Sequence, residues 1–264
     1  MQYRHLAFII FLSTCYFLLA TFLCGCTSEY NLATGREETL FYSTDKEINL
    51  GRSIAKQVEA KYKLVEDPAV QEKVDRIGQK IAQGCDRKEL VYYFKALEGK
   101  EVNAVSLPGG FVYIYKGLID IASVDELAGV IAHEVAHIVA RHSIKKLQAS
   151  MGYMLARIIT AQTTGSAGAV YGADLAFSEV MLGYSREDEL LADKVGVRYV
   201  ERAGFDPHAM ISFLAKLKEA KRKEPLAPLS YGRTHPYIAD RISVVKQELG
   251  ENISFTDYIN RESE

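Results

Sequence analysis

The chain has 264 residues, of which 48% are hydrophobic and 25% are charged, and its formal net charge is −2. This length and composition suffice for one domain with a hydrophobic core, and the near-neutral charge argues against a nucleic-acid-binding protein. Of the four cysteines, three lie within the first 26 residues and only Cys85 follows them. The remainder of the chain therefore has neither a disulfide framework nor a cysteine-ligated metal site.

The amino terminus is predicted to be a targeting segment, because an uncharged apolar run over residues 6–23 follows Arg4. A run of this length can be the core of a signal peptide or a short membrane-spanning helix. The sequence Leu-Cys-Gly-Cys at its end resembles the lipobox of bacterial lipoproteins, which implies removal of residues 1–25 and lipidation of Cys26. We expect a lipid-anchored protein that faces the periplasm, and Thr27 favours the outer membrane. The alternative is an uncleaved helix in the inner membrane.

A polar tether is predicted to connect this targeting segment to the folded domain. Residues 26–42 are largely polar and contain several turn-forming residues, a composition typical of spacers. We expect the domain itself to span residues 43–250 and a short tail to occupy residues 251–264.

Helical and strand-like patterns follow each other within the domain and predict the α+β class. Amphipathic helices are expected over residues 44–63 and 68–84, the first opening on a capping-box pattern at Thr44 and Glu47. Three strand-like runs predict a small sheet, over residues 90–97, 102–107 and 111–115. The edge of this sheet could accept an extended peptide. An ordinary structural hairpin explains the last two runs equally well.

The strongest functional signal is a His-Glu-x-x-His motif in an apolar helical run that ends near His142. His133 and His137 project from the same helix face, so both imidazoles can reach one metal ion. Glu134 lies about 100° round the helix from His133, where it can act as a general base on a metal-bound water without being a ligand. Such helices bind zinc, so the sequence predicts a single zinc ion.

Glu126 has two interpretations on this helix. With Ser123 it completes a capping box that would start the helix. It also lies two turns before His133 on nearly the same face, where it could orient the imidazole by accepting its other ring proton. The sequence leaves both roles open.

A third metal ligand must come from outside this helix. A site with a third histidine six residues after the second would need histidine at Ser143, and His142 is rotated by about 100° from that direction. A later helix, capped by Ser185, offers carboxylates instead, because Glu189 and Asp193 lie at i and i+4 on one face. Glu189 as the ligand and Asp193 as the hydrogen-bond partner of a histidine explain both residues.

The motif at 133–137 and the later Ser-Arg-x-x-Glu-x-x-Ala-Asp at 185–193 together resemble metallopeptidase family forty-eight, the HtpX-like and CAAX prenyl protease-like zinc endopeptidases. The resemblance extends over about residues 45–248 and includes Thr-His-Pro at 234–236. It implies a mainly helical, zincin-like domain with a small sheet beside the metal-binding helix. It also implies that Glu134 is the base and that zinc is bound by His133, His137 and Glu189.

The resemblance implies further roles for residues that the pattern alone does not explain. Asn103 and Ala104 would line the substrate cleft, and His235 and Arg241 would lie over the active site and stabilise the oxyanion. Thr234 is predicted to cap a helix that begins at His235. Without the resemblance, His235 would be interpreted as a lone surface histidine. Its imidazole could also occupy the open zinc position and hold the enzyme latent.

The expected function is zinc-dependent hydrolysis of peptide bonds in unfolded or misassembled cell-envelope proteins. This substrate class follows from the resemblance to the exported lipoprotein branch of the family, and the outer-membrane assembly machinery is an expected partner. The alternative is a membrane-tethered holdase or assembly factor with a structural zinc site. The fourth zinc position separates the two, since a catalytic site keeps it open and a structural site fills it.

Overall fold

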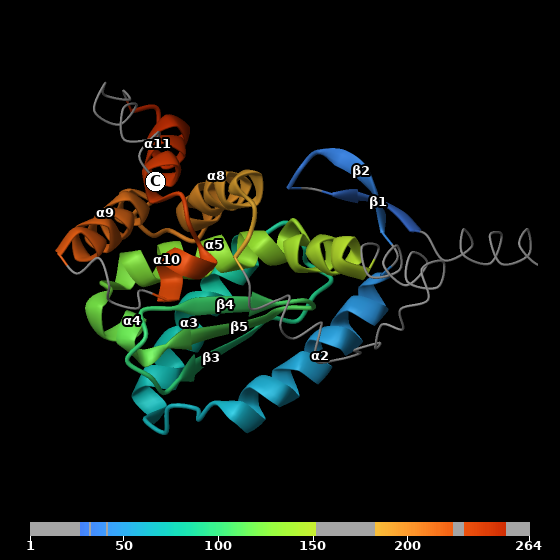
Figure 1. The fold of residues 1–264 in the computed structure, drawn as a ribbon, viewed down its shortest axis with the longest axis horizontal. Helices are drawn as coiled ribbons and strands as arrows, with labels where there is room; N and C mark the ends of the chain where they lie inside the picture. The colour runs from blue at the N-terminus through green and yellow to red at the C-terminus, as the bar shows by residue number, and fades with distance from the viewer. Residues whose placement is uncertain (1–26, 32, 41, 152–182, 224–229, 252–264) are drawn as a thin grey trace, which may run out of the picture.

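The computed structural model describes residues 27–31, 33–40, 42–151, 183–223 and 230–251. In these ranges the chain is mainly helical with two small sheets (Figure 1), which confirms the predicted α+β class. Over the same ranges, the helices are too short or too polar to cross a membrane. Cys26, the predicted signal peptide and residues 252–264 of the predicted tail lie outside the described residues, and the predicted domain boundaries stay predictions.

The larger sheet has three strands, in the order β3-β5-β4. Its central strand, β5 (Phe111–Tyr115), is parallel to β3 (Tyr93–Leu97) and antiparallel to β4 (Ala104–Leu107). The turn between β4 and β5 needs two residues in the left-handed region, which Gly109 and Gly110 provide with φ of 75° and 103°. The predicted hairpin is therefore confirmed, and β4 is an edge strand of the sheet.

The two faces of this sheet pack against different helices. One face carries Phe111, Tyr113 and Tyr115 and packs in one hydrophobic cluster with α2 (Thr44–Lys61). The opposite face carries Val112 and Ile114 and packs with α3 (Pro68–Gly84) and α5 (Val124–Val139). Side chains of even number on β4 therefore point toward α5, because its register pairs Ala104 with Ile114.

The starts of α2 and α3 differ from each other. α3 begins at Pro68, as predicted, and Asp67 caps it by accepting a hydrogen bond from the backbone N–H of Ala69. The capping box predicted at Thr44 is wrong, because α2 begins after Ser43 and its cap has no side-chain hydrogen bond. Glu47 is buried instead and accepts from the Arg87 guanidinium at 2.9 Å and from the backbone N–H of Gly109 at 3.2 Å. These contacts attach α2 to the β4–β5 turn.

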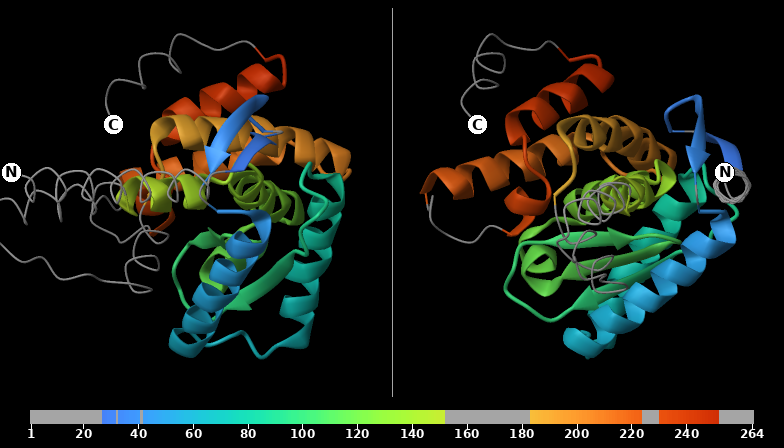
Figure 2. Two further views of the ribbon diagram at one scale, coloured as in Figure 1. Left: turned by 90° about the vertical axis from the view of Figure 1, so that its right-hand side faces the viewer. Right: turned by 45° about the vertical axis from the view of Figure 1, so that its right-hand side comes forward.

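Helix α5 lies between the sheet and a second helical layer (Figures 1 and 2). It follows the short α4 (Lys116–Ile121), and the second layer contains α8 (Arg186–Arg202), α9 (His208–Lys223) and α11 (Ile238–Glu248). The short α10 (Ser230–Thr234) lies beside α5 near the edge of the sheet. All side chains from Glu126 to the end of α5 are buried, as the apolar character of the helix requires.

Residues 27–40 belong to the predicted tether but fold as a hairpin of β1 (Thr27–Asn31) and β2 (Arg36–Leu40). Asn31 Nδ2 donates a hydrogen bond to the backbone oxygen of Ala140 at 3.1 Å, and Lys145 Nζ lies 2.8 Å from Glu38 Oε1. The hairpin is thus attached to the end of α5, and the role of this segment as a tether between the domain and a membrane stays a prediction.

Candidate metal centre

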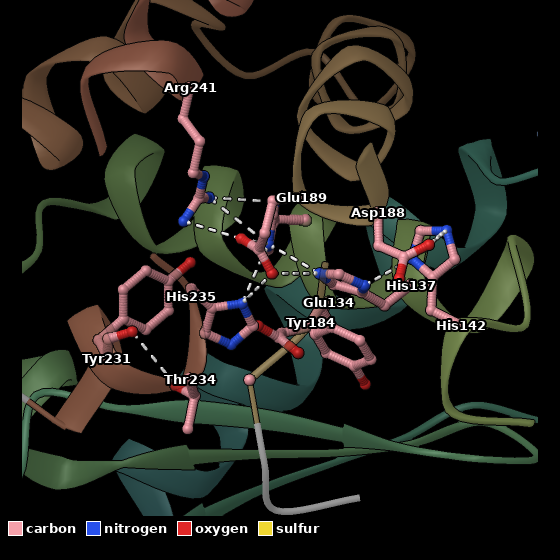
Figure 3. Close-up of polar contacts among 12 residues, drawn as sticks. Glu134, His137, His142, Tyr184, Asp188, Glu189, Tyr231, Thr234, His235 and Arg241 are labelled. Atoms are coloured by element: carbon pink, nitrogen blue, oxygen red, sulfur yellow. Dashed lines mark hydrogen bonds and ion pairs between the residues drawn. The ribbon is translucent and has the colours of Figure 1, made fainter. Parts of the chain in front are cut away.

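Four buried donor side chains converge where α5, α8 and the turn after α10 meet (Figure 3). His133 and His137 come from α5 and Glu189 from α8, as predicted from their spacing. His235 joins them from the turn between α10 and α11. One ligand atom from each of the four lies within 4.8 Å of all the others.

The spacing of these donors fits a tetrahedral metal ion. Ligands about 2.0–2.1 Å from a tetrahedral ion lie about 3.3 Å from each other. His133 Nε2 lies 3.0 Å from His137 Nε2, 3.3 Å from His235 Nδ1 and 3.4 Å from Glu189 Oε2. Glu189 Oε1 lies 3.1 Å from His235 Nδ1 and 3.4 Å from His137 Nε2. Donor atoms that converge at these distances in a buried site fit one metal ion.

Glu134 lies beside the donors but is not one of them. It is fully buried, with Oε1 3.2 Å from His235 Nε2, and Oε2 accepts a hydrogen bond from Ser106 Oγ at 2.7 Å. Ser106 lies on the α5-facing side of β4, and the sequence analysis missed it. The only feature of the sequence that could have indicated a role for Ser106 is that it is a single polar residue in an otherwise apolar strand.

Asp193 holds the ring of His133 from behind. Its Oδ1 lies 2.8 Å from His133 Nδ1, as predicted for a hydrogen-bond partner of a ligand histidine. Arg241 donates to both Asp193 oxygens, at 2.7 Å and 2.8 Å, and its Nη1 lies 3.3 Å from Glu189 Oε2. Arg241 is thus buried against two carboxylates of α8 and positions them.

Glu126 takes the structural role that the sequence left open. Ser123 and Glu126 form the predicted capping box, each side chain accepting from the backbone N–H of the other. Glu126 also accepts from Ser212 Oγ at 2.9 Å and from Lys216 Nζ at 2.7 Å. The partner of the His133 ring is Asp193 and not Glu126.

The turn that carries His235 differs from the prediction. Thr234 is the last residue of α10 and not the cap of a helix that begins at His235. The chain turns at Tyr237, with φ of 64°, before α11 starts, so His235 and Arg241 lie in separate elements. Thr234 Oγ1 donates to Asn103 Oδ1 at 3.1 Å.

Asn103 and Ala104, predicted to line a substrate cleft, are both buried beside this turn. The backbone oxygen of the preceding Val102 accepts a hydrogen bond from the backbone N–H of Tyr231 at 3.0 Å. In this arrangement α10 covers the start of β4, and the role of Asn103 and Ala104 in substrate binding stays a prediction.

Two tyrosines stack on the candidate ligands, and the sequence analysis identified neither. The Tyr184 ring stacks on His137 at a centroid distance of 3.9 Å, and Tyr231 stacks on His235 at 4.4 Å. The Tyr184 hydroxyl lies 2.8 Å from Ser143 Oγ. Tyr231 precedes His235 by four residues, about one helical turn. This spacing could have predicted that the two rings lie on the same side of the chain.

The sequence analysis excluded His142 as a metal ligand, because its predicted position on the helix points away from the metal. In the structure, His142 lies behind the ring of His137. The two Nδ1 atoms lie 2.7 Å apart, and His142 is buried. Burial, followed by the influence of His137, holds the pKa of His142 well below its ordinary value.

Burial and charge control the protonation of the other site residues. Burial is the main cause that lowers the pKa of His137 to about 3. Burial and Arg241 also lower the pKa of His133, but Asp193 and Glu189 outweigh them and raise it to about 9. Burial raises the pKa of Glu189, yet its cationic neighbours hold it well below the ordinary value. A bound cation would displace the proton of His133, since metal ligands must be deprotonated.

These features define a metallopeptidase-type centre: two histidines one turn apart on a buried helix, a carboxylate from a later helix, and a free glutamate beside them. Residues 68–249 match the model of peptidase family M48, and the chain belongs to this family.

Curated relatives carry names of the same kind. The beta-barrel assembly-enhancing protease of Escherichia coli K12 is 26% identical over 223 residues, which are 81% of this chain and 45% of that protein. The mitochondrial metalloendopeptidase OMA1 of Schizosaccharomyces pombe is 30% identical over 179 residues, which are 67% of this chain and 52% of that protein. The chain therefore spans about half the length of these relatives. The crystal structure of S. mikatae Ste24p aligns with 74% of this chain and 55% of its own, at 14% identity and a TM-score of 0.41.

Proposed function

We propose that this chain is a zinc-dependent endopeptidase that hydrolyses peptide bonds of unfolded or misassembled cell-envelope proteins. One observation carries the catalytic part of the proposal. His133, His137 and Glu189 present donors at the spacing of a tetrahedral ion, and Glu134 lies next to them without being a donor. A site built only for structure has no need of a buried carboxylate in that position.

The proposed chemistry divides between the ion and the chain. Zinc held by His133, His137 and Glu189 supplies Lewis acidity and lowers the pKa of water to about 7. Glu134 takes a proton from the attacking water and delivers it to the leaving amine. His235 is our candidate for stabilising the oxyanion. For this role, the imidazole of His235 must first move away from the other three donors. We assign Arg241 to positioning Asp193 and Glu189, since its guanidinium is directed at these carboxylates.

The proposed substrates are chains that expose extended segments. Strand β4 is an edge strand beside α5, and an extended peptide could add to it through backbone hydrogen bonds with little sequence preference. The name of the Escherichia coli relative refers to beta-barrel assembly, which supports substrates or partners connected with that process. The outer-membrane assembly machinery is therefore the partner that we propose.

Removal of the metal tests the proposal directly. We expect the full chain to bind one zinc ion and to cut an unfolded protein, and a chelator to stop cleavage until zinc is restored. Free zinc at about 1,000 times its dissociation constant should stabilise the fold by about 4 kcal/mol, measured by thermal unfolding. A purified chain that binds no zinc, or that cuts equally well after chelation, would contradict the proposal.

The fourth donor, His235, supports a second candidate function, in which the metal position that a substrate needs is already filled. His235 Nδ1 fills the tetrahedron, and Glu134 has no exposed surface, so an extended peptide has no access to the base. A filled position is typical of structural zinc sites, which keeps the holdase or assembly-factor function as the second candidate. The same geometry fits a latent peptidase that His235 holds closed.

His235→Ala separates these candidates. If His235 holds a latent peptidase closed, the variant should cut a short unfolded peptide at least as fast as the unaltered chain, because the fourth position is then open. His208→Ala, which removes a half-exposed histidine, is the control and should change nothing. Loss of all cleavage in the His235 variant alone would show a catalytic role, and absence of cleavage in every variant would favour the holdase.

We further propose that the chain is anchored through a lipid on Cys26 and faces the periplasm from the outer membrane. Cys26→Ser is expected to abolish incorporation of labelled fatty acid and to leave an uncleaved precursor. Cys24→Ser is the control and should retain both lipidation and cleavage. If Cys26→Ser changes neither the mass nor the membrane fraction, the uncleaved inner-membrane helix is the better explanation.

A further inference from the structure

The helix that carries the metal motif is interrupted just after it. Helix α5 ends at Val139, Ala140 is its cap, and Arg141 adopts a left-handed conformation with φ of 56°. Helical residues resume at His142. In a continuous helix, a residue five positions after His137 would lie about 140° round the axis from it. The interruption instead brings the two rings to a centroid distance of 4.9 Å (Figure 3).

Contacts from another helix hold this interruption in place. Arg141 Nη2 donates to Thr44 Oγ1 at 3.0 Å, and Arg141 Nε lies 3.4 Å from Glu47 Oε2. Both partners lie at the start of α2. A non-glycine residue in the left-handed region is unfavourable by itself and persists where its surroundings fix it. The position of His142 is therefore built by two elements and is not an accident of a frayed helix end.

The hydrogen-bonding possibilities along this line of rings fix their tautomers. His137 directs Nε2 at the other donors, so in the metal-bound site Nε2 must carry a lone pair and Nδ1 the proton. That proton points at His142 Nδ1, 2.7 Å away, which must then be the acceptor. The proton of His142 is left on Nε2, which lies 3.3 Å from Asp188 Oδ1 without forming a hydrogen bond to it.

We propose that His142 is a positioning residue that fixes the tautomer and the ring direction of His137 and so strengthens metal binding. His142 stands behind the Nδ1 atom of His137 as Asp193 stands behind the Nδ1 atom of His133, at 2.7 Å and 2.8 Å. Partners of this kind behind a ligand imidazole raise metal affinity by about 10–100-fold. This inference rests on the proposed metal site, and it assigns a role to a residue that is itself outside the donor cluster.

An isosteric pair of substitutions tests the inference. Asparagine places its Oδ1 where the imidazole Nδ1 of His142 lies, so His142→Asn can still accept from His137. His142→Leu has nearly the same shape and cannot accept. In the full chain, measured by competition with a zinc chelator, we expect zinc affinity to fall about 10–100-fold for His142→Leu and about threefold or less for His142→Asn.

The outcomes separate this inference from the proposed function. If His142 only fills space, the leucine variant should bind zinc at least as tightly as the asparagine variant, and the inference is overturned. If the unaltered chain and both variants bind zinc equally, the inference alone fails. If the unaltered chain binds no zinc, the proposed metal site fails and the inference fails with it.

A second measurement does not depend on how well the variants fold. Nitrogen chemical shifts of the six histidines in the ¹⁵N-labelled, zinc-loaded chain report the tautomer of each ring. We expect His137 to carry its proton on Nδ1 in the unaltered chain. A proton on Nδ1 of His142 would overturn the inference, because His142 could then not accept the hydrogen bond from His137.

Discussion

Replacing Glu134 with glutamine is expected to lower cleavage of an unfolded protein by about 10²–10⁴-fold and to leave zinc binding unchanged. Glutamine keeps the length and shape of glutamate, and its oxygen can still accept the hydrogen bond from Ser106. It cannot take a proton from water at neutral pH. Because Glu134 is not one of the donors, the substitution should lower the cleavage rate without changing zinc affinity.

Zinc content and cleavage rate should be measured on the same preparations of the unaltered and Glu134→Gln chains. Glu126→Gln is a matched control, since Glu126 is also buried on α5 but only caps the helix and pairs with Lys216. That variant should retain the rate even if it unfolds more easily. If His235 keeps the unaltered chain inactive, the comparison is made in a His235→Ala background. A glutamine variant that cuts at the full rate would remove Glu134 from the mechanism.

The part of the site that the sequence predicts lies on regular helices. His133 and His137 on α5, and Glu189 and Asp193 on α8, are each separated by four residues, and helix geometry fixes their common direction without tertiary information. Helices α2 and α3 and the three strands of the larger sheet follow from residue patterns in the same way, whereas the β1–β2 hairpin does not. The order β3-β5-β4 does not, because the parallel pairing of β3 with β5 is a non-local contact.

The residues that the sequence analysis missed or misplaced follow departures from regular geometry. His142 faces His137 only because Arg141 turns the chain, and His235 reaches the donors only because α10 ends before it and Tyr237 turns the chain after it. Neither left-handed residue is a glycine, so composition gives no warning of either turn. Glu126 illustrates the opposite difficulty, since one local pattern allowed two roles and only its tertiary partners decided between them.

Asp193→Ala should affect stability and metal binding together. Its carboxylate is fully buried between His133 and Arg241, and removing it leaves the buried guanidinium with Glu189, 3.3 Å away, in place of two carboxylates. Breaking a buried pair in this way costs about 3–5 kcal/mol of unfolding free energy. The His133 ring also loses its orienting partner, so zinc affinity should fall about 10–100-fold. Glu187→Ala, on the exposed face of the same helix, should change stability by about 1 kcal/mol or less.

A double variant separates the two effects of Asp193. Asp193→Ala with Arg241→Met removes both charges, and an apolar replacement of a buried pair is often neutral. We expect the double variant to recover much of the unfolding free energy lost in Asp193→Ala, measured in denaturant. Zinc affinity should stay low, because His133 still lacks Asp193 and Glu189 also lacks Arg241. Recovery of zinc affinity together with stability would mean that Asp193 acts only by neutralising Arg241. Persistence of the stability loss would mean that the pair contributes more than the burial of two opposite charges.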